Sequence, residues 1–170
     1  AFQARPFLFP RRGFPPACLF REEAMIRFAE ITEENFDAVI RMKRPPGENF
    51  VAPNSVSLAQ AWLYRNDGDV FPFAIYENDS PVGFLLLEEE KENGILILWR
   101  IMITVEQEGK GYGTQAVRLL AEQARRSGKY RALRLDCDRA NAAAWHIYQK
   151  LGFSPTGAVN HGSPELQLLL

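Results

Sequence analysis

From Ile26 onward, segments whose apolar residues have strand-like spacing alternate with segments whose apolar residues have helical spacing. Short runs of branched and aromatic residues predict strands, and longer segments with apolar residues three and four positions apart predict helices. The expected strands are 26–31, 70–76, 81–90, 95–105, 131–138 and 165–170. The expected helices are 33–42, 58–66, one that follows the glycines at 109–113 and stops at Gly128, and one over 141–151 that stops at Gly152.

The order of these elements predicts a three-layer α/β (α+β) domain with a mixed sheet. The strand over 95–105 is almost entirely apolar, so we expect it at the centre of the sheet. With the next helix and the strand over 131–138, it forms a parallel crossover. Thr32 and Ser57 are expected to cap the first two helices, and the prolines within 44–55 predict a loop between them.

Composition narrows the class of protein. The chain has 170 residues, 46% of them hydrophobic, which fits a single globular domain. Its formal net charge of −1 does not favour nucleic acid binding, and no apolar run approaches the roughly 20 residues of a membrane span. Two cysteines, Cys18 and Cys137, indicate a reducing, cytoplasmic location, and His146 and His161 lack the spacing of metal ligands.

Residues 1–24 differ from the rest of the chain because they are rich in Pro, Arg and Phe and show no sustained period. Met25 looks like a natural start. We therefore interpret 1–24 as an extension derived from upstream sequence or from cloning, and 25–170 as the working domain. The alternative is a binding arm for a partner.

The segment that begins at Gln107, "QEGKGYGTQAVRLL", places three glycines at the start of a helix. Glycine is a poor helix former, so its presence there needs a reason. One reason is a tight turn, and the other is a backbone that approaches a phosphate at the helix N-terminus. The spacing of the glycines fits neither a P-loop nor a dinucleotide-binding fingerprint.

A second motif, "NAAAWHIYQKLGF", follows about thirty residues later. Together with "EGKGYG" after an apolar strand, it resembles the GNAT superfamily of N-acetyltransferases. The family pattern Asn-x-x-Ala-x-x-x-Tyr-x-x-x-Gly-Phe is met by Asn141, Ala144, Tyr148, Gly152 and Phe153. The segments "FVAPNSVSLAQAW", "LWRIMI" and "PTGAVNHGSPELQLLL" further resemble the bacterial spermine/spermidine, or diamine, acetyltransferases, so the likeness covers 25–170.

The resemblance implies a GNAT-like, mostly antiparallel sheet that splays between two parallel strands, with acetyl-CoA as cosubstrate in the opening. The Tyr148 hydroxyl is then the acid that protonates the departing thiolate, and a backbone N–H near Met102 polarises the thioester carbonyl. Glu108 departs from the family, which usually has Gln or Arg there, so we expect Glu108→Gln to tighten acetyl-CoA binding. The implied cofactor-binding residues are Ile101, Met102, Ile103, Gly109, Lys110, Gly111, Tyr112, Gly113, Thr114, Asn141 and Ala144.

The acceptor is expected to be a primary amine, such as a polyamine or diamine. The cluster "LEEEKEN", with Glu88 and Glu90, would attract its cations, and Asn54 lies where the family builds the acceptor site. A general base must deprotonate the amine, and the sequence offers Glu88, Glu89, Glu90, Asp136 and Glu165 without choosing among them.

Other functions stay open. The acceptor could be a peptide N-terminus, a lysine or an aminoglycoside, and Glu108 would also fit a non-catalytic module that binds acetyl-CoA. Trp62 is expected in the core. A nucleophilic pair of Cys137 and His146 is disfavoured because Asp136 and Asp138 flank the thiol. The apolar strand at the C-terminus suggests pairing into a homodimer.

Overall fold

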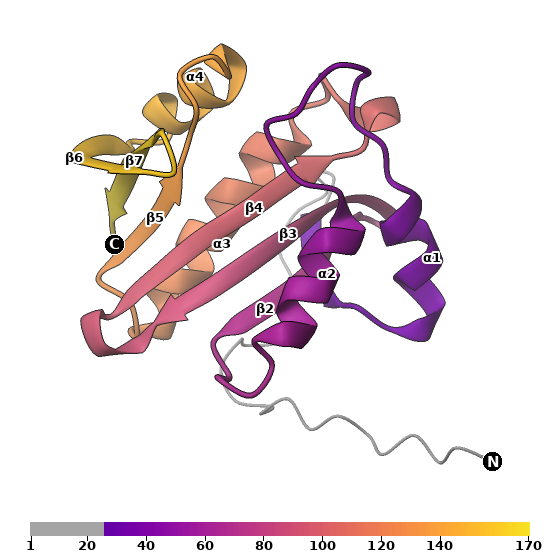
Figure 1. Cartoon of the computed structure of the whole chain (residues 1–170), viewed down its shortest axis with the longest axis horizontal. Helices are drawn as coiled ribbons and strands as arrows, with labels where there is room; N and C mark the ends of the chain where they lie inside the picture. Colours follow the sequence, from indigo (N-terminus) through magenta and orange to yellow (C-terminus); the bar gives the residue numbers. More distant parts are fainter. Residues whose placement is uncertain (1–25) are drawn as a thin grey trace.

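The structure is a computed structural model that describes residues 26–170, so the predicted extension 1–24 and Cys18 lie outside the described residues. Seven strands form one mixed sheet in the spatial order β1-β2-β3-β4-β5-β7-β6 (Figure 1). The pair β4 and β5 is parallel and the other pairs are antiparallel, as the sequence predicted. The strands are β1 (Ile26–Glu30), β2 (Val70–Glu77), β3 (Ser80–Glu90), β4 (Ile95–Ile103), β5 (Ala132–Asp136), β6 (Ser154–Asn160) and β7 (Ser163–Leu169).

Helices cover both faces of this sheet, which gives three layers. In Figure 1, α1 and α2 lie on one face and α3 lies on the other, while α4 is beside β5 and β7. Alternate side chains of β3 and β4 therefore enter two separate cores, one against α3 and one against α1 and α2. The helices are α1 (Glu33–Arg41), α2 (Asn54–Leu63), α3 (Tyr112–Ser127) and α4 (Ala142–Lys150), with short 3-10 turns η1 (Lys91–Asn93) and η2 (Val105–Gln107).

Two helix boundaries, the start of α1 and the end of α3, are explained by the residues that cap them. Thr32 caps α1 as predicted, and its capping box is completed by Asn35, whose side chain accepts from the Thr32 N–H at 2.9 Å. Gly128 ends α3 in the left-handed conformation at φ 64°, also as predicted.

The predicted start of the second helix is wrong. Helix α2 begins at Asn54, directly after Pro53, and Ser57 lies fully buried inside it instead of capping it. Pro53 takes the cap position, with φ −53° and an extended ψ of 146°, and no side chain caps the helix there. Trp62 is also not in the core: its side chain is 55% exposed, with Arg65 stacked over its ring.

The sequence missed strand β6. Its seven residues, "SPTGAVN", include no buried position and contain a proline and a glycine, so they carry no strand period. Pairing with β7 defines this strand, and the register between Pro155 and Val159 is interrupted by an irregularity. Tertiary pairing therefore decided an element for which local sequence gave no signal.

Candidate active site

The two parallel strands separate at the middle of the sheet. They are paired only at three positions, from Ile95 with Ala132 to Ile97 with Arg134, although β4 continues to Ile103. A bulge at Trp99 contributes to this divergence, because the partner of β4 in β3 changes from Leu87 at Leu98 to Leu86 at Arg100. The two strands therefore diverge, as Figure 1 shows, and we call the region between their separated ends the opening.

One edge of β4 has no strand partner within this opening. The Thr104 N–H donates to Val82 O at 2.9 Å, so it points to β3. Backbone N–H groups of a strand alternate between its two sides. The Met102 N–H therefore points to β3 as well, and the N–H and C=O groups of Ile101 and Ile103 point into the opening. The candidates for the donor expected near Met102 are therefore the N–H groups of its two neighbours.

The glycines that raised the question of a phosphate site lie at the end of β4, after η2. Gly109 and Gly111 have φ values of 76° and 82°, which glycine adopts at little cost. No side chain caps α3 at Gly111, so the first N–H groups of the helix remain available to an anion. A Cβ at Gly109 would meet nothing within 4 Å, so the loop has open space beside it. These features fit a pyrophosphate bound to backbone amides.

The two side chains beside Gly109, those of Glu108 and Lys110, are exposed to solvent. Glu108 is exposed, and the Lys110 ammonium donates to Gln107 Oε1 at 2.7 Å. The effect of Glu108 on acetyl-CoA binding stays a prediction. Gly113 is close to β4, since a Cβ there would lie 3.6 Å from Ile103 Cγ1.

Helix α4 supplies the other wall of the opening. Asn141 caps this helix, and its Oδ1 accepts from the Ala144 N–H at 3.2 Å. Tyr148 is 8% exposed and its ring lies 5.6 Å from that of Phe153. Among residues 26–170 the Tyr148 hydroxyl has no hydrogen-bond partner within the protein. Burial, followed by nearby Cys137, raises its pKa, and the charge of Arg44 opposes that rise.

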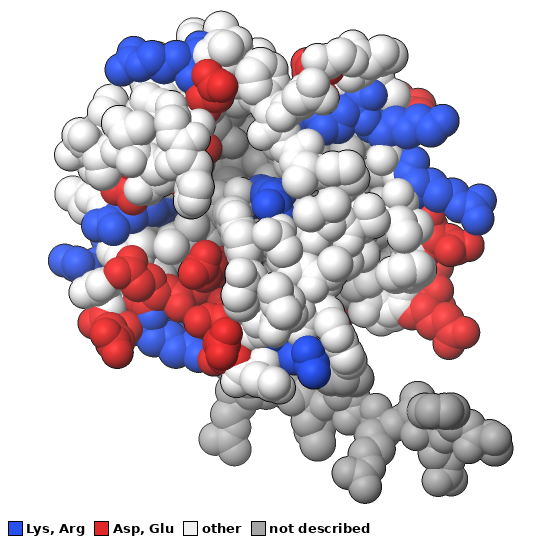
Figure 2. Space-filling view, in the orientation of Figure 1, with Lys and Arg blue, Asp and Glu red and all other residues white. Residues whose placement is uncertain are grey.

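Acidic side chains lie on the face of the sheet that α1 and α2 leave open. Figure 2 shows them gathered below the hollow that separates α4 and β6 from α2. Because side chains alternate along β3, Glu88 and Glu90 lie on this face and Glu89 does not. The Glu89 carboxylate instead accepts a hydrogen bond from the Tyr130 hydroxyl near the end of α3, so Glu89 is removed from the candidate bases.

The carboxylates on this face differ in their partners. Arg134 lies 3.9 Å from Glu90 Oε2 and 3.9 Å from Glu165 Oε1. Asp136 accepts from Asn160 Nδ2 at 3.0 Å. The Glu88 carboxylate has neither a hydrogen bond nor an ion pair within the described residues, and burial, then Asp69 and Glu90, raises its pKa. Among these carboxylates, that of Glu88 is therefore the most available to a bound cation.

Asn54, predicted to contact the acceptor, lies inside the fold beside Met102. It is 4% exposed, and its Nδ2 donates to Val39 O at 2.8 Å and contacts Met102 Sδ at 3.3 Å. It therefore fastens α2 to α1 and to β4, and its burial argues against direct contact with an acceptor.

Two arginines on the acceptor side were not foreseen from the sequence. Arg100, at the bulge, donates to Ser57 Oγ at 3.2 Å and to Gln60, and its partial burial lowers the pKa of its guanidinium group. Arg44 lies in the loop between α1 and α2 and binds Glu48. Arg100 belongs to the segment "LWRIMI", but its partners on α2, like the pairing of Arg44 with Glu48, became visible only in the fold.

Nucleophilic chemistry at Cys137 is disfavoured by its surroundings. The thiol is 5% exposed, and burial, with the Asp138 charge, raises its pKa to about 11. His146 is exposed on α4. Within residues 26–170 no cluster of three or more His, Cys, Asp or Glu could hold a metal ion, and no helix is long and apolar enough to span a membrane.

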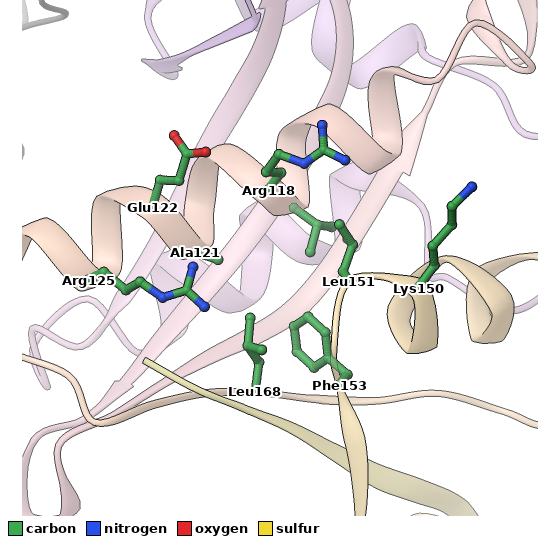
Figure 3. Close-up of a pocket in the computed structure, with 9 residues that line it drawn as sticks. Arg118, Ala121, Glu122, Arg125, Lys150, Leu151, Phe153 and Leu168 are labelled. Carbon is green, nitrogen blue, oxygen red and sulfur yellow. The ribbon is translucent and has the colours of Figure 1, made fainter.

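A cavity of about 270 Å³ lies elsewhere, between α3, the end of α4 and β7. Figure 3 shows an apolar floor that includes Leu151, Phe153 and Leu168, with the guanidinium of Arg125 reaching over it. Glu122 and Lys150 point away from the centre. This cavity begins beyond the first turn of α3, so it is separate from the glycine loop and the opening.

The comparisons with known proteins agree with this geometry. The model of the acetyltransferase (GNAT) family matches residues 34–153, most of the described chain. The chain belongs to the GNAT family. Members of this family take their acetyl group from acetyl-CoA, which fits the amide-lined loop and the unpaired edge of β4.

Two curated relatives come from Bacillus subtilis (strain 168), and both are uncharacterized N-acetyltransferases. YbbJ is 33% identical over 113 residues, which cover 60% of this chain and 69% of that protein. YobR is 43% identical over 58 residues, 34% of this chain; the match spans about a quarter (23%) of the length of YobR.

Solved structures share the fold at low sequence identity. The spermidine N-acetyltransferase from Vibrio cholerae, in complex with CoA and spermine, has a TM-score of 0.67 at 13% identity, covering 86% of this chain and 96% of that one. The aminoglycoside acetyltransferase AAC(6')-Ib, in complex with coenzyme A, also has a TM-score of 0.67, at 19% identity, covering 85% and 95%.

Proposed function

We propose that this protein transfers an acetyl group from acetyl-CoA to a primary amine by direct attack in a ternary complex. The observation that carries this proposal is the position of Tyr148, a buried tyrosine without a hydrogen-bond partner among the described residues, on the helix that walls the opening between β4 and β5. The amide-lined glycine loop at the end of β4 supports the cofactor part of the proposal.

Acetyl-CoA supplies the acetyl group as a thioester and leaves as the free thiol. An N–H of Ile101 or Ile103 donates to the thioester carbonyl oxygen, where negative charge develops. The amine nitrogen bonds to the carbonyl carbon, the carbon–sulfur bond breaks, and Tyr148 Oη gives its proton to the sulfur. An amine that starts as an ammonium ion loses two protons: the first is released to solvent before attack, and the second, lost as the amide forms, restores the Tyr148 hydroxyl through water.

The amine must lose a proton before it can attack. At pH 7 this costs about 4.6 kcal/mol for an amine of pKa about 10.4, at about 1.36 kcal/mol per unit. The Glu88 carboxyl group lacks a partner among the described residues, but Glu88 pairs with Ile97, which is too far from Met102 along β4 for Glu88 to take this proton. We therefore assign Glu88 to a distal cation of the acceptor and not to this proton transfer.

For the acceptor we propose a polyamine or diamine such as spermidine. Asp69, Glu88, Glu90, Asp136 and Glu165 supply negative charge along the open face, and Arg134 compensates only part of it. Glu88 pairs with Ile97, which lies about 13 Å from Met102 along β4, at about 3.3 Å per residue with the bulge discounted. A long amine could therefore react at Met102 while its far cation lies near Glu88.

Thiol release measured across a panel of amines tests both the acetyltransferase activity and the choice of a polyamine as acceptor. The panel contains spermidine, spermine, putrescine, a lysine peptide, a peptide with a free N-terminus and an aminoglycoside. Release with any amine supports the acetyltransferase, and the highest kcat/KM with a polyamine supports the finer proposal. Measurable acetyl-CoA binding without release for any amine would favour the non-catalytic module instead.

We also propose that the protein is a cytoplasmic homodimer. The edge strand β6 is exposed, with Val159 at 63%, and Leu169 at the end of β7 is 71% exposed. A dodecameric form is described for the spermidine N-acetyltransferase of Vibrio cholerae. Light scattering on the purified protein should give twice the chain mass, and a monomer mass would remove this part of the proposal.

A further inference from the structure

Asp136 is the last residue of β5, and it borders the opening. Leu135 and Cys137, its neighbours in the chain, both enter the core against α3, so the Asp136 side chain lies on the other face of the sheet, which α1 and α2 leave open. Asp136 is exposed, and its Oδ1 accepts a hydrogen bond from Asn160 Nδ2 of β6 at 3.0 Å. The carboxylate is therefore held in place on the acceptor side and stays in contact with solvent.

Strand register places Asp136 at nearly the same height along the sheet as the expected thioester. Arg134 pairs with Ile97, and Asp136 lies two residues further along β5, about 7 Å at about 3.3 Å per residue. On β4, Ile101 lies about 10 Å beyond Ile97 when the extra residue of the bulge is discounted. The heights of Asp136 and Ile101 therefore differ by about one residue, and the opening separates them.

The other candidate bases lie further from Ile101. Glu88 and Glu90 pair within the first three residues of β4, near the start of that strand. Glu165 is the partner of Asp136 in β7, one strand further from the opening. Among the candidates, Asp136 is thus the carboxylate closest in register to the expected thioester.

Two charged side chains face Asp136 from neighbouring positions in the sheet. Arg134 lies two residues earlier on β5, and Glu165 lies opposite on β7. Arg134 Nε lies 3.9 Å from Glu165 Oε1, so these opposite charges compensate each other, and Glu165 also accepts from Thr156 Oγ1 at 2.8 Å. The charge that remains for an ammonium group beside the opening is that of Asp136.

We propose that Asp136 is the general base of the reaction: its carboxylate takes the first proton from the ammonium group of the acceptor, directly or through one water, before the nitrogen attacks. The N–H bond breaks, the nitrogen keeps the electron pair, and the proton then passes from Asp136 to solvent, so the carboxylate is regenerated. This inference rests on the proposed function, because it requires an amine acceptor and a thioester carbonyl bound beside Ile101.

The proposed acid and base lie on opposite faces of the sheet. Cys137, which directly follows Asp136, points into the core against α3 that also holds Tyr148. Tyr148 can therefore protonate the departing sulfur from one face while Asp136 deprotonates the amine on the other. The two proton transfers do not compete for one group.

Steady-state thiol release as a function of pH tests this assignment. Asp136→Asn removes the base and keeps a side chain of the same shape, which can still accept from Asn160. We expect kcat with spermidine at pH 7 to fall about 100-fold, within the range for a general base. The loss should shrink as the pH rises toward about 10.4, where the amine loses its proton unaided. The KM for acetyl-CoA should stay unchanged.

Two other carboxylates provide matched controls. Asp138 is two residues further along, and its carboxylate accepts from the Ala140 N–H at 2.9 Å. Asp138→Asn should leave kcat and its pH profile unchanged, because this side chain belongs to the turn before α4. Glu88→Gln should raise the KM for spermidine without moving the pH profile of kcat. Thermal unfolding shows whether each variant is folded.

The outcomes separate a base from other roles of Asp136. A raised KM for spermidine with unchanged kcat in Asp136→Asn would overturn the inference, because a carboxylate that only attracts cations affects binding and not proton transfer. An equal loss of kcat at every pH would also overturn it, since a structural defect does not disappear when the amine is neutral. Absence of thiol release with any amine in the unsubstituted protein would instead count against the proposed function, so the two failures are distinguishable.

Discussion

Tyr148 is the residue on which the proposed chemistry depends most. Replacing it by phenylalanine removes the proton donor and leaves the ring packed against Phe153. We expect Tyr148→Phe to lower kcat by about 100-fold, within the range for a general acid. Its hydroxyl has no protein partner among residues 26–170, so stability should fall by less than about 1 kcal/mol. Steady-state thiol release and thermal unfolding measure the two effects, and full kcat in a folded variant would contradict the role.

Glu88 should affect stability and activity in opposite directions. Its pKa is raised in the folded protein, so the folded state binds more protons than the unfolded state, and stability falls as pH rises through this range. Glu88→Gln should therefore raise the melting temperature at pH 7, and the gain should disappear below about pH 4, where both states are protonated. The same variant should raise the KM for spermidine severalfold, because it removes a negative charge from the open face.

The neighbouring glutamate provides a matched control for that variant. Glu89 is on the same strand but accepts a hydrogen bond from Tyr130 on the opposite face. Glu89→Gln should leave the KM for spermidine unchanged. An equal loss of activity in both variants would show that general negative charge, and not the open face, is responsible.

Among the elements, the start of α3 combines a strained backbone position with a proposed binding role. Gly111 has φ 82° at the cap of this helix, so Gly111→Ala should destabilise the protein by about 1 kcal/mol and weaken acetyl-CoA binding at least tenfold. Gly128, at the other end of the same helix, has φ 64° and nothing within 4 Å of an added Cβ. Gly128→Ala should cost similar stability and leave acetyl-CoA affinity, measured by calorimetry, unchanged.

In β4, the hydrophobic pattern predicted the position of the strand in the sheet but not its bulge. Its apolar run predicted a central strand, and the structure confirms that position. The bulge at Trp99 places two successive residues, Trp99 and Arg100, toward α2. The apolar sequence of the strand gives no sign of this irregularity. The loss of pairing beyond Ile97 depends on where β5 goes, which is decided by its antiparallel pairing with β7.

For the whole molecule, the distribution of charge should appear in the salt dependence of the reaction. The acidic open face in Figure 2 attracts a multivalent amine more than a monovalent one. We expect the KM for spermidine to rise severalfold between about 0.01 M and about 1 M salt, as the Debye length falls from about 30 Å to about 3 Å. A monoamine should show a much smaller change, and equal dependence for both would argue against recognition of a distal cation.

Sequence alone determined the elements with strong local signals. The apolar runs of β3 and β4, the helix between Tyr112 and Gly128, and the cap at Thr32 all follow from periodicity and end residues, and the paired glycine and Asn-to-Phe153 motifs led to the correct family. These features depend on neighbours within a few positions, so they are visible without a fold.

Tertiary structure alone decided which side chains share a site. It paired the exposed β6 with β7, buried Asn54 and turned Glu89 away from Glu88. The physical reason is that strand register, burial and charge–charge distance arise from contacts between segments far apart in sequence. A local pattern therefore proposes the chemistry, and packing decides which residues are close enough to carry it out.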